Sequence, residues 1–167
     1  MPPSRLAAAR GLVVLAAVLL AGCSLAPGVS SQRGVSEHVR IERSRDGATT
    51  VLLPVTIQGR GPYTFALDTG ASRSLVSTTV AADIGLSRAG PPEPIQGLGG
   101  VTRAVPVRVT SWSTGNIKLP PMVITSADLA TGRGAGGLQG LLGSDVWDAI
   151  GSFKLDYRTS TLTVNPQ

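Results

Sequence analysis

The chain has 167 residues, a length that fits one domain with additional segments. Its 21 glycines and 12 prolines favour a turn-rich β protein over a helical bundle. The formal net charge is +5, but no run of five basic residues occurs and basic residues are not interleaved with aromatic ones, so nucleic-acid binding is not expected. The single cysteine excludes an intrachain disulfide.

Residues 1–22 are typical of a secretory signal. Arg5 and Arg10 are followed by an unbroken apolar stretch that is too short to span a bilayer comfortably as a helix. The stretch ends in Leu20-Ala21-Gly22-Cys23, which resembles the lipobox of bacterial lipoproteins. The resemblance implies that Cys23 becomes the new N-terminus after cleavage and carries fatty acyl chains such as palmitate. The alternatives are an ordinary secretory signal with a chance cysteine, or a retained membrane anchor.

The segment after Cys23 predicts a flexible tether. Residues 24–37 are rich in Ser, Gly and Pro and show no periodicity. We therefore expect a signal peptide over 1–22, a lipidated cysteine with its tether over 23–37, and a folded domain over 38–167.

The first part of the domain predicts short strands. Residues 38–43 and 49–57 are β-branched runs, and residues 63–68 alternate between large and small side chains. The turn cluster at 58–62 predicts a hairpin that joins the second run to the third. Residues 74–77 predict one more short strand.

The middle of the domain combines a helix with further strands. Residues 78–86 predict a short helix that Gly85 closes. Residues 91–109 contain two strand-like pieces around a glycine-rich turn. Residues 115–125 predict either a strand pair or one bulged strand, because Pro120 and Pro121 cannot donate to a sheet.

The C-terminal part ends in a hairpin. Residues 130–137 predict a loop, and residues 138–151 change from an apolar run into a helix for which Ser144 is the expected N-cap. Residues 153–164 predict a terminal hairpin whose turn lies at 157–160.

Two motifs carry the functional information. Asp68-Thr69-Gly70 ends an apolar strand and continues into Ala71-Ser72, and Leu141-Leu142-Gly143 follows some seventy residues later. Together they resemble the retropepsin-like aspartic proteases, the single-lobed relatives of pepsin, over most of residues 48–164. The resemblance, with the lipobox, implies a bacterial lipoprotein-type member. It also implies an all-β fold, the half-barrel of the acid proteases with one or two short helices.

The resemblance assigns a role to each residue of the first motif. Asp68 would be catalytic, and such enzymes use two carboxylates that share one proton because like charges at close range cannot both ionise. Only one Asp-Thr-Gly is present, so the second carboxylate would come from an identical subunit. Thr69 would bond across the two-fold axis, Gly70 would leave room for water and substrate, and Ser72 would hydrogen-bond the Asp68 carboxylate. Ala71 completes this supporting loop.

Two glycine-containing segments have structural roles in this family. Gly97-Leu98-Gly99-Gly100 lies where the family places the flap hairpin that closes over a peptide, although a plain hairpin turn explains the same residues equally well. Leu141-Leu142-Gly143 corresponds to the element that crosses behind the catalytic loop.

The remaining polar residues favour no other chemistry. Asp145 is expected to be structural, bonding backbone or an arginine. His38 is the only histidine and no G-x-S-x-G motif is present, so a Ser-His-Asp triad is not expected. Without a histidine or cysteine cluster, or a nucleotide-binding glycine pattern, we expect no metal and no cofactor. Four further aspartates are expected to be solvated or capping residues: Asp83, Asp128, Asp148 and Asp156.

Two hypotheses follow. The first is an aspartic endopeptidase that acts on peptides or proteins as a homodimer, anchored through Cys23 on the extracytoplasmic face of a membrane in the bacterial cell envelope. The second is a non-catalytic peptide-binding or envelope-structural module that retains the same fold.

Overall fold

A long hairpin forms the centre of the fold in the computed structural model, which describes residues 34–97, 100–129 and 137–165. β3 (Thr49–Ile57) and β4 (Arg60–Leu67) pair antiparallel over most of their length. Gln58 and Gly59 join them with φ angles of 49° and 77°, as in a two-residue type I′ turn. The predicted hairpin is confirmed, but its turn is shorter than expected because Arg60 already pairs with Ile57.

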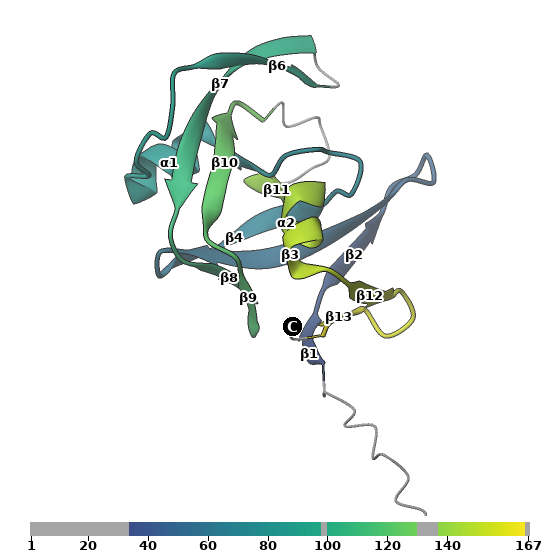
Figure 1. Cartoon of the computed structure of the whole chain (residues 1–167). Helices are drawn as coiled ribbons and strands as arrows, with labels where there is room; N and C mark the ends of the chain where they lie inside the picture. Colours follow the sequence, from purple (N-terminus) through teal and green to yellow (C-terminus); the bar gives the residue numbers. More distant parts are fainter. Residues whose placement is uncertain (1–33, 98–99, 130–136, 166–167) are drawn as a thin grey trace, which may run out of the picture. The chain divides into compact units, whose positions relative to one another are not determined.

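The hairpin belongs to a large sheet (Figure 1). Within the described residues this sheet has ten strands, and β2 (Arg40–Arg43) joins it by pairing with β3. The other strands lie in the order β6 (Glu93–Gly97), β7 (Gly100–Val109), β10 (Met122–Ala127), β5 (Leu75–Ser77), β11 (Gly140–Leu142), β4, β3, β8 (Trp112–Thr114) and β9 (Ile117–Leu119). The predicted all-β class is confirmed.

A second sheet contains both ends of the described chain. Its three strands, counted over the described residues, are β1 (Val35–His38), β13 (Thr161–Val164) and β12 (Phe153–Asp156), in that order. Val35 pairs with Val164, so the predicted tether boundary at residue 37 is wrong. The edge of β13 offers backbone partners to residues whose composition alone predicts a flexible linker.

The terminal hairpin turns where the sequence predicts it. β12 and β13 pair from Phe153 opposite Val164 to Asp156 opposite Thr161. The Asp156 carboxylate accepts hydrogen bonds from the backbone N–H groups of Thr159 and Arg158, and these bonds hold the pKa of Asp156 below its ordinary value.

The two helices of the described region are each seven residues long. α1 (Thr78–Ile84) is capped by the Ser77 hydroxyl, which accepts from Val80 N, and it ends at Gly85 in the left-handed conformation, as predicted. α2 (Ser144–Ile150) has Gly143 as its N-cap, so the predicted cap at Ser144 is wrong. The Ser144 hydroxyl instead donates to the backbone oxygen of Ala71.

The segment with two prolines forms separate strands. β9 pairs with β8, whereas β10 pairs with β7 and β5. The two strands do not pair with each other, and the predicted alternative of one bulged strand is wrong. Pro120 lies between them, and its carbonyl accepts a hydrogen bond of 2.7 Å from the Trp112 indole. A proline pair lacks N–H groups and therefore ends one pairing before the next begins.

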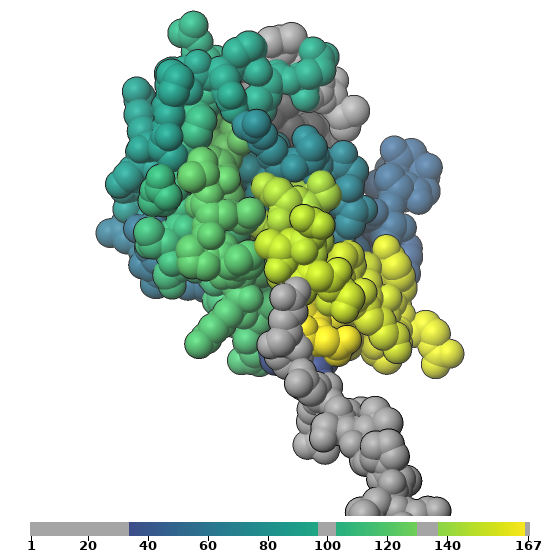
Figure 2. All heavy atoms as spheres, in the orientation of Figure 1, coloured from purple at the N-terminus to yellow at the C-terminus, as the bar shows by residue number. Residues whose placement is uncertain are grey.

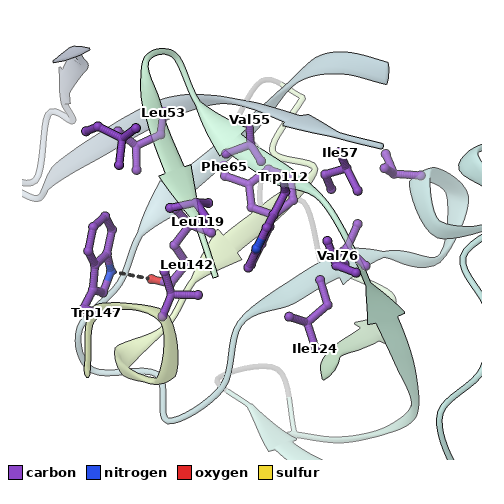
Figure 3. Packing of buried hydrophobic residues seen from close by; sticks show 14 of the residues in the cluster. Leu53, Val55, Ile57, Phe65, Val76, Trp112, Leu119, Ile124, Leu142 and Trp147 are labelled. Atoms are coloured by element: carbon purple, nitrogen blue, oxygen red, sulfur yellow. Dashed lines mark hydrogen bonds between the residues drawn. The ribbon is translucent and has the colours of Figure 1, made fainter. Parts of the chain in front are cut away.

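The core lies around the central hairpin and is built mainly from aliphatic side chains (Figure 3). Its largest fully buried members are Phe65, Leu53, Ile57, Ile117, Ile124, Leu142 and Leu162. Trp147 of α2 closes one side, where its indole donates to Leu142 O and its ring lies 4.6 Å from that of Phe153. Figure 2 shows α2, β12 and β13, in yellow-green to yellow, as one continuous patch of surface.

The structure does not describe most of the predicted N-terminal segments or most of the predicted loop 130–137. Residues 1–33, including Cys23, and residues 130–136 lie outside the described residues. Among the residues that are described, no helix is long and apolar enough to cross a membrane.

Thr114 provides a test of the packing in β8. Its side chain is fully buried, and its hydroxyl has no hydrogen-bond partner among the described residues. An unpaired buried hydroxyl costs about 1–3 kcal/mol, and valine has nearly the same shape. We therefore expect Thr114→Val to raise the free energy of unfolding by about 1 kcal/mol in urea denaturation. Thr110→Val, at an exposed position, is the control, and a less stable Thr114→Val protein would contradict the packing described.

Candidate active site

Asp68 lies in the loop that connects β4 to β5. The Asp68 backbone N–H donates to Leu142 O at 3.0 Å, which fixes the start of the loop. One oxygen of its carboxylate, Oδ1, accepts hydrogen bonds from the N–H groups of Gly70 at 3.0 Å and Ala71 at 3.2 Å. The loop therefore folds around the carboxylate, and the Asp68 residue remains exposed at the surface.

The other loop residues take different positions. Thr69, Gly70 and Ser72 are exposed, and Ala71 is half-buried. In the described part of the chain Ser72 makes no hydrogen bond to Asp68. The backbone N–H groups of Gly70 and Ala71 hydrogen-bond the Asp68 carboxylate instead. The turn itself therefore supplies the support that the sequence predicts from a side chain.

β11 passes directly between the two strands that flank the loop. Leu141 lies opposite Ala66 of β4 in a parallel pairing and opposite Leu75 of β5 in an antiparallel pairing. Leu142 lies opposite Leu67, and its carbonyl receives the Asp68 N–H. The structure thus places the predicted crossing element behind the Asp68 loop.

Glycine is required at the first residue of β11 and at the residue that follows its last one. A Cβ on Gly140 would lie 2.2 Å from the Phe65 ring. A Cβ on Gly143 would lie 2.6 Å from the carbonyl carbon of Arg73 and 2.9 Å from Ala71 O. Contacts this short force backbone to move, so the loop backbone can approach β11 only because these positions lack side chains.

A hydrogen-bonded pair of the buried Ser74 and the half-buried Asp145 joins the loop to α2. The Asp145 carboxylate accepts from the Ser74 N–H at 2.8 Å, from the Ser74 hydroxyl at 2.7 Å and from Val146 N at 2.8 Å. The Ser74 hydroxyl in turn accepts from Gly143 N at 2.9 Å. The expected backbone bonding of Asp145 is present. The sequence does not predict the role of Ser74, because a serine at a strand start gives no signal of its partner 71 residues away.

The hairpin of β6 and β7 is the predicted flap region. Gly97 and Gly100 form its last described pair, while Leu98 and Gly99 lie outside the described residues. At the other end of β6, Glu93 forms an ion pair of 2.5 Å with Arg73 of the Asp68 loop. The structure therefore joins the hairpin and the loop through a contact that the sequence does not predict.

The comparisons with known proteins agree with this arrangement. A family model described as aspartyl protease matches residues 53–146, which are 94 of the 167 residues and include the Asp68 loop, the hairpin and β11. The chain belongs to the aspartyl protease family.

The fold of this chain is similar to that of a retropepsin-like aspartic protease from Rickettsia conorii, with 19% identity and a TM-score of 0.51, over 78% of this chain and 98% of that chain. It is also similar to the retroviral protease-like domain of Ddi1 from Leishmania major, with 15% identity and a TM-score of 0.46, over 71% and 89% of the two chains. No curated protein matches the sequence. This chain therefore has the retropepsin-like fold.

Other kinds of site receive no support from the described side chains. His38 is exposed at the end of β1, in the sheet that does not contain the Asp68 loop. No group of three or more potential metal ligands occurs in the part of the chain that the structure describes.

Gly143 tests the close contact behind the loop. Because a methyl group there would press on the backbone of Arg73 and Ala71, we expect Gly143→Ala to lower the free energy of unfolding by about 1–3 kcal/mol or more. Urea denaturation measures this loss. Gly90→Ala is the matched control, since its Cβ would meet Pro106 at 3.4 Å, an ordinary contact. Equal stability of the two variants would show that the loop does not lie against β11 as described.

Proposed function

We propose that the protein is an aspartic endopeptidase that hydrolyses peptide bonds as a homodimer. The observation that carries the proposal is the Asp68 loop: an exposed carboxylate held by its own turn and backed by β11, in a chain of the aspartyl protease family. Such a loop fixes a carboxylate without burying it, so the carboxylate remains accessible to water, to substrate and to a second subunit.

The single chain supplies one half of the required chemistry. Hydrolysis needs one carboxylate as the base that takes a proton from water and a second, protonated one that polarises the scissile carbonyl. Asp145, which bonds to the same loop, has both oxygens engaged by Ser74 and is therefore not available. A second copy of Asp68 from an identical subunit completes the pair.

The bonding of the carboxylate leaves one oxygen for catalysis. Both backbone donors, Gly70 N and Ala71 N, reach Oδ1, and no described residue donates to Oδ2. In the proposed dimer Oδ2 faces the partner carboxylate and the attacking water. The two carboxylates then share one proton, because both cannot remain ionised at such close range.

The substrate we propose is an extended segment of a peptide or protein. It would lie between the Asp68 loop and the β6–β7 hairpin, which the Arg73–Glu93 contact places next to each other. A strand-like substrate can pair its backbone with such a hairpin, so main-chain recognition would supply binding and side-chain pockets would supply specificity.

Asp68→Asn is the direct test. The amide has nearly the same shape but cannot act as the base, so we expect cleavage of a peptide library to fall by about 10³-fold or more with little change in unfolding free energy. Asp148→Asn, an exposed aspartate of α2, is the control and is expected to cleave at the normal rate. Full activity of Asp68→Asn would exclude the proposal.

The dimer is tested by mixing. Co-refolding wild-type chain with an excess of Asp68→Asn should reduce cleavage per wild-type chain, because each mixed dimer contains one working carboxylate. Activity per chain should also rise with protein concentration until the dimer is saturated. Cleavage per wild-type chain that changes neither with added Asp68→Asn nor with protein concentration would contradict the dimer. Absence of cleavage in every sample would favour a peptide-binding or envelope-structural module.

We propose further that Cys23 anchors the enzyme in a bacterial cell envelope, on the extracytoplasmic face of a membrane. The basis is the Leu20-Ala21-Gly22-Cys23 sequence after an apolar stretch. When the full chain is expressed in a bacterium, we expect it to incorporate a palmitate analogue and to sediment with membranes. Cys23→Ser should lose the label and the membrane association, and Ser24→Ala is the control. Labelling that persists in Cys23→Ser would contradict the anchor.

A further inference from the structure

We propose that Arg73 and Glu93 act as positioning residues whose ion pair holds the β6–β7 hairpin against the loop of Asp68. The effect of this ion pair on peptide cleavage rests on the proposed proteolytic function, whereas the contact itself does not. Among the described residues, this pair is the one hydrogen bond or ion pair that joins the two segments. In Figure 2 the teal residues of the hairpin lie above the bluer residues of the loop.

The hairpin projects from the sheet beyond a defined point. β10 pairs with β7 only from Val105 to Val109, so Gly100–Ala104 pairs with β6 alone. On the other strand, the segment before β6 meets β7 at an isolated bridge between Arg88 and Val107. Pro91 and Pro92 follow and lack N–H groups, and the pairing of β6 with β7 starts at Glu93. The five residue pairs from Glu93–Ala104 to Gly97–Gly100 are therefore attached to the body of the protein at one end.

Glu93 lies at this attachment. It is opposite Ala104, whose side chain is fully buried, and four residues from the last described pair of the hairpin. Four strand residues correspond to about 13 Å, so a small rotation at the attachment moves the far end by a much larger distance. A contact at Glu93 is thus well placed to limit that rotation, and its partner Arg73 lies five residues after Asp68.

The strength of the contact suits a reversible role. The side chains of Arg73 and Glu93 are 61% and 40% exposed, so water and salt screen their attraction. A contact of this kind biases the hairpin toward the loop without locking it. An extended peptide can therefore still enter, and after entry the pair favours the arrangement in which loop and hairpin both face the peptide.

Glu93→Gln tests the pair with almost no change in shape. If the ion pair raises the population of the binding-competent arrangement, its loss should increase KM for a peptide about two- to five-fold and leave kcat nearly unchanged. The charge-swapped variant Arg73→Glu/Glu93→Arg should recover at least part of the loss. Arg40→Gln removes a similarly exposed ion pair, Arg40–Glu42, and should leave KM unchanged. The difference between wild type and Glu93→Gln should shrink as NaCl rises from 0.05 to about 0.5 M.

A second readout does not depend on cleavage. Relaxation-dispersion NMR of the full chain should show larger microsecond-to-millisecond exchange at the backbone amides of β6 and at residues 100–104 in Glu93→Gln than in wild type or Arg40→Gln. Unchanged dispersion with unchanged or lower KM would overturn the positioning role. If dispersion increases in Glu93→Gln but the wild-type protein cleaves no peptide, the role of the ion pair in holding the hairpin is supported and the proposed proteolytic function is contradicted.

Discussion

The passage of β11 between β4 and β5 is the constraint on which the site depends. These two strands flank Asp68, yet each pairs with β11 and not with the other. The loop must therefore span two strand spacings, about 9–10 Å, and turn over the end of β11. The Asp68 N–H donates to Leu142 O and the Ser144 N–H donates to Ala71 O, so the end of β11 and the start of α2 support the two sides of the loop.

This arrangement explains residues that do no chemistry. Gly140 and Gly143 allow backbone and the Phe65 ring to approach β11 at distances that no side chain would permit. The Ser74 hydroxyl, fully buried, both donates to Asp145 and accepts from Gly143 N, so it satisfies polar groups at the point where three segments meet. The position of Asp68 is thus set by buried contacts on one side, although its own side chain is exposed.

The parts of this structure that follow from local patterns could be predicted from the sequence. The β3–β4 hairpin, the α1 helix with its Gly85 end and the terminal hairpin each depend on alternation, caps or turn residues within a few positions. The Ser74–Asp145 and Arg73–Glu93 contacts depend on pairing between distant segments, and a single sequence contains no signal for them. The predicted N-cap of α2 is wrong for the same reason. The Ser144 hydroxyl donates to the backbone oxygen of Ala71, a residue that only the fold brings near.

The two sides of the proposed site are held in physically different ways. The Asp68 loop is fixed by backbone hydrogen bonds and by the bond between the buried Ser74 hydroxyl and the half-buried Asp145 carboxylate. Breaking that bond would leave the Ser74 hydroxyl unpaired away from water, which is destabilising. The β6–β7 hairpin is joined to that loop through an exposed ion pair, whose loss costs little because water solvates both charges. The proposed endopeptidase would use this difference. Its carboxylate would already be oriented when an extended substrate arrives, whereas its hairpin could move to admit the substrate.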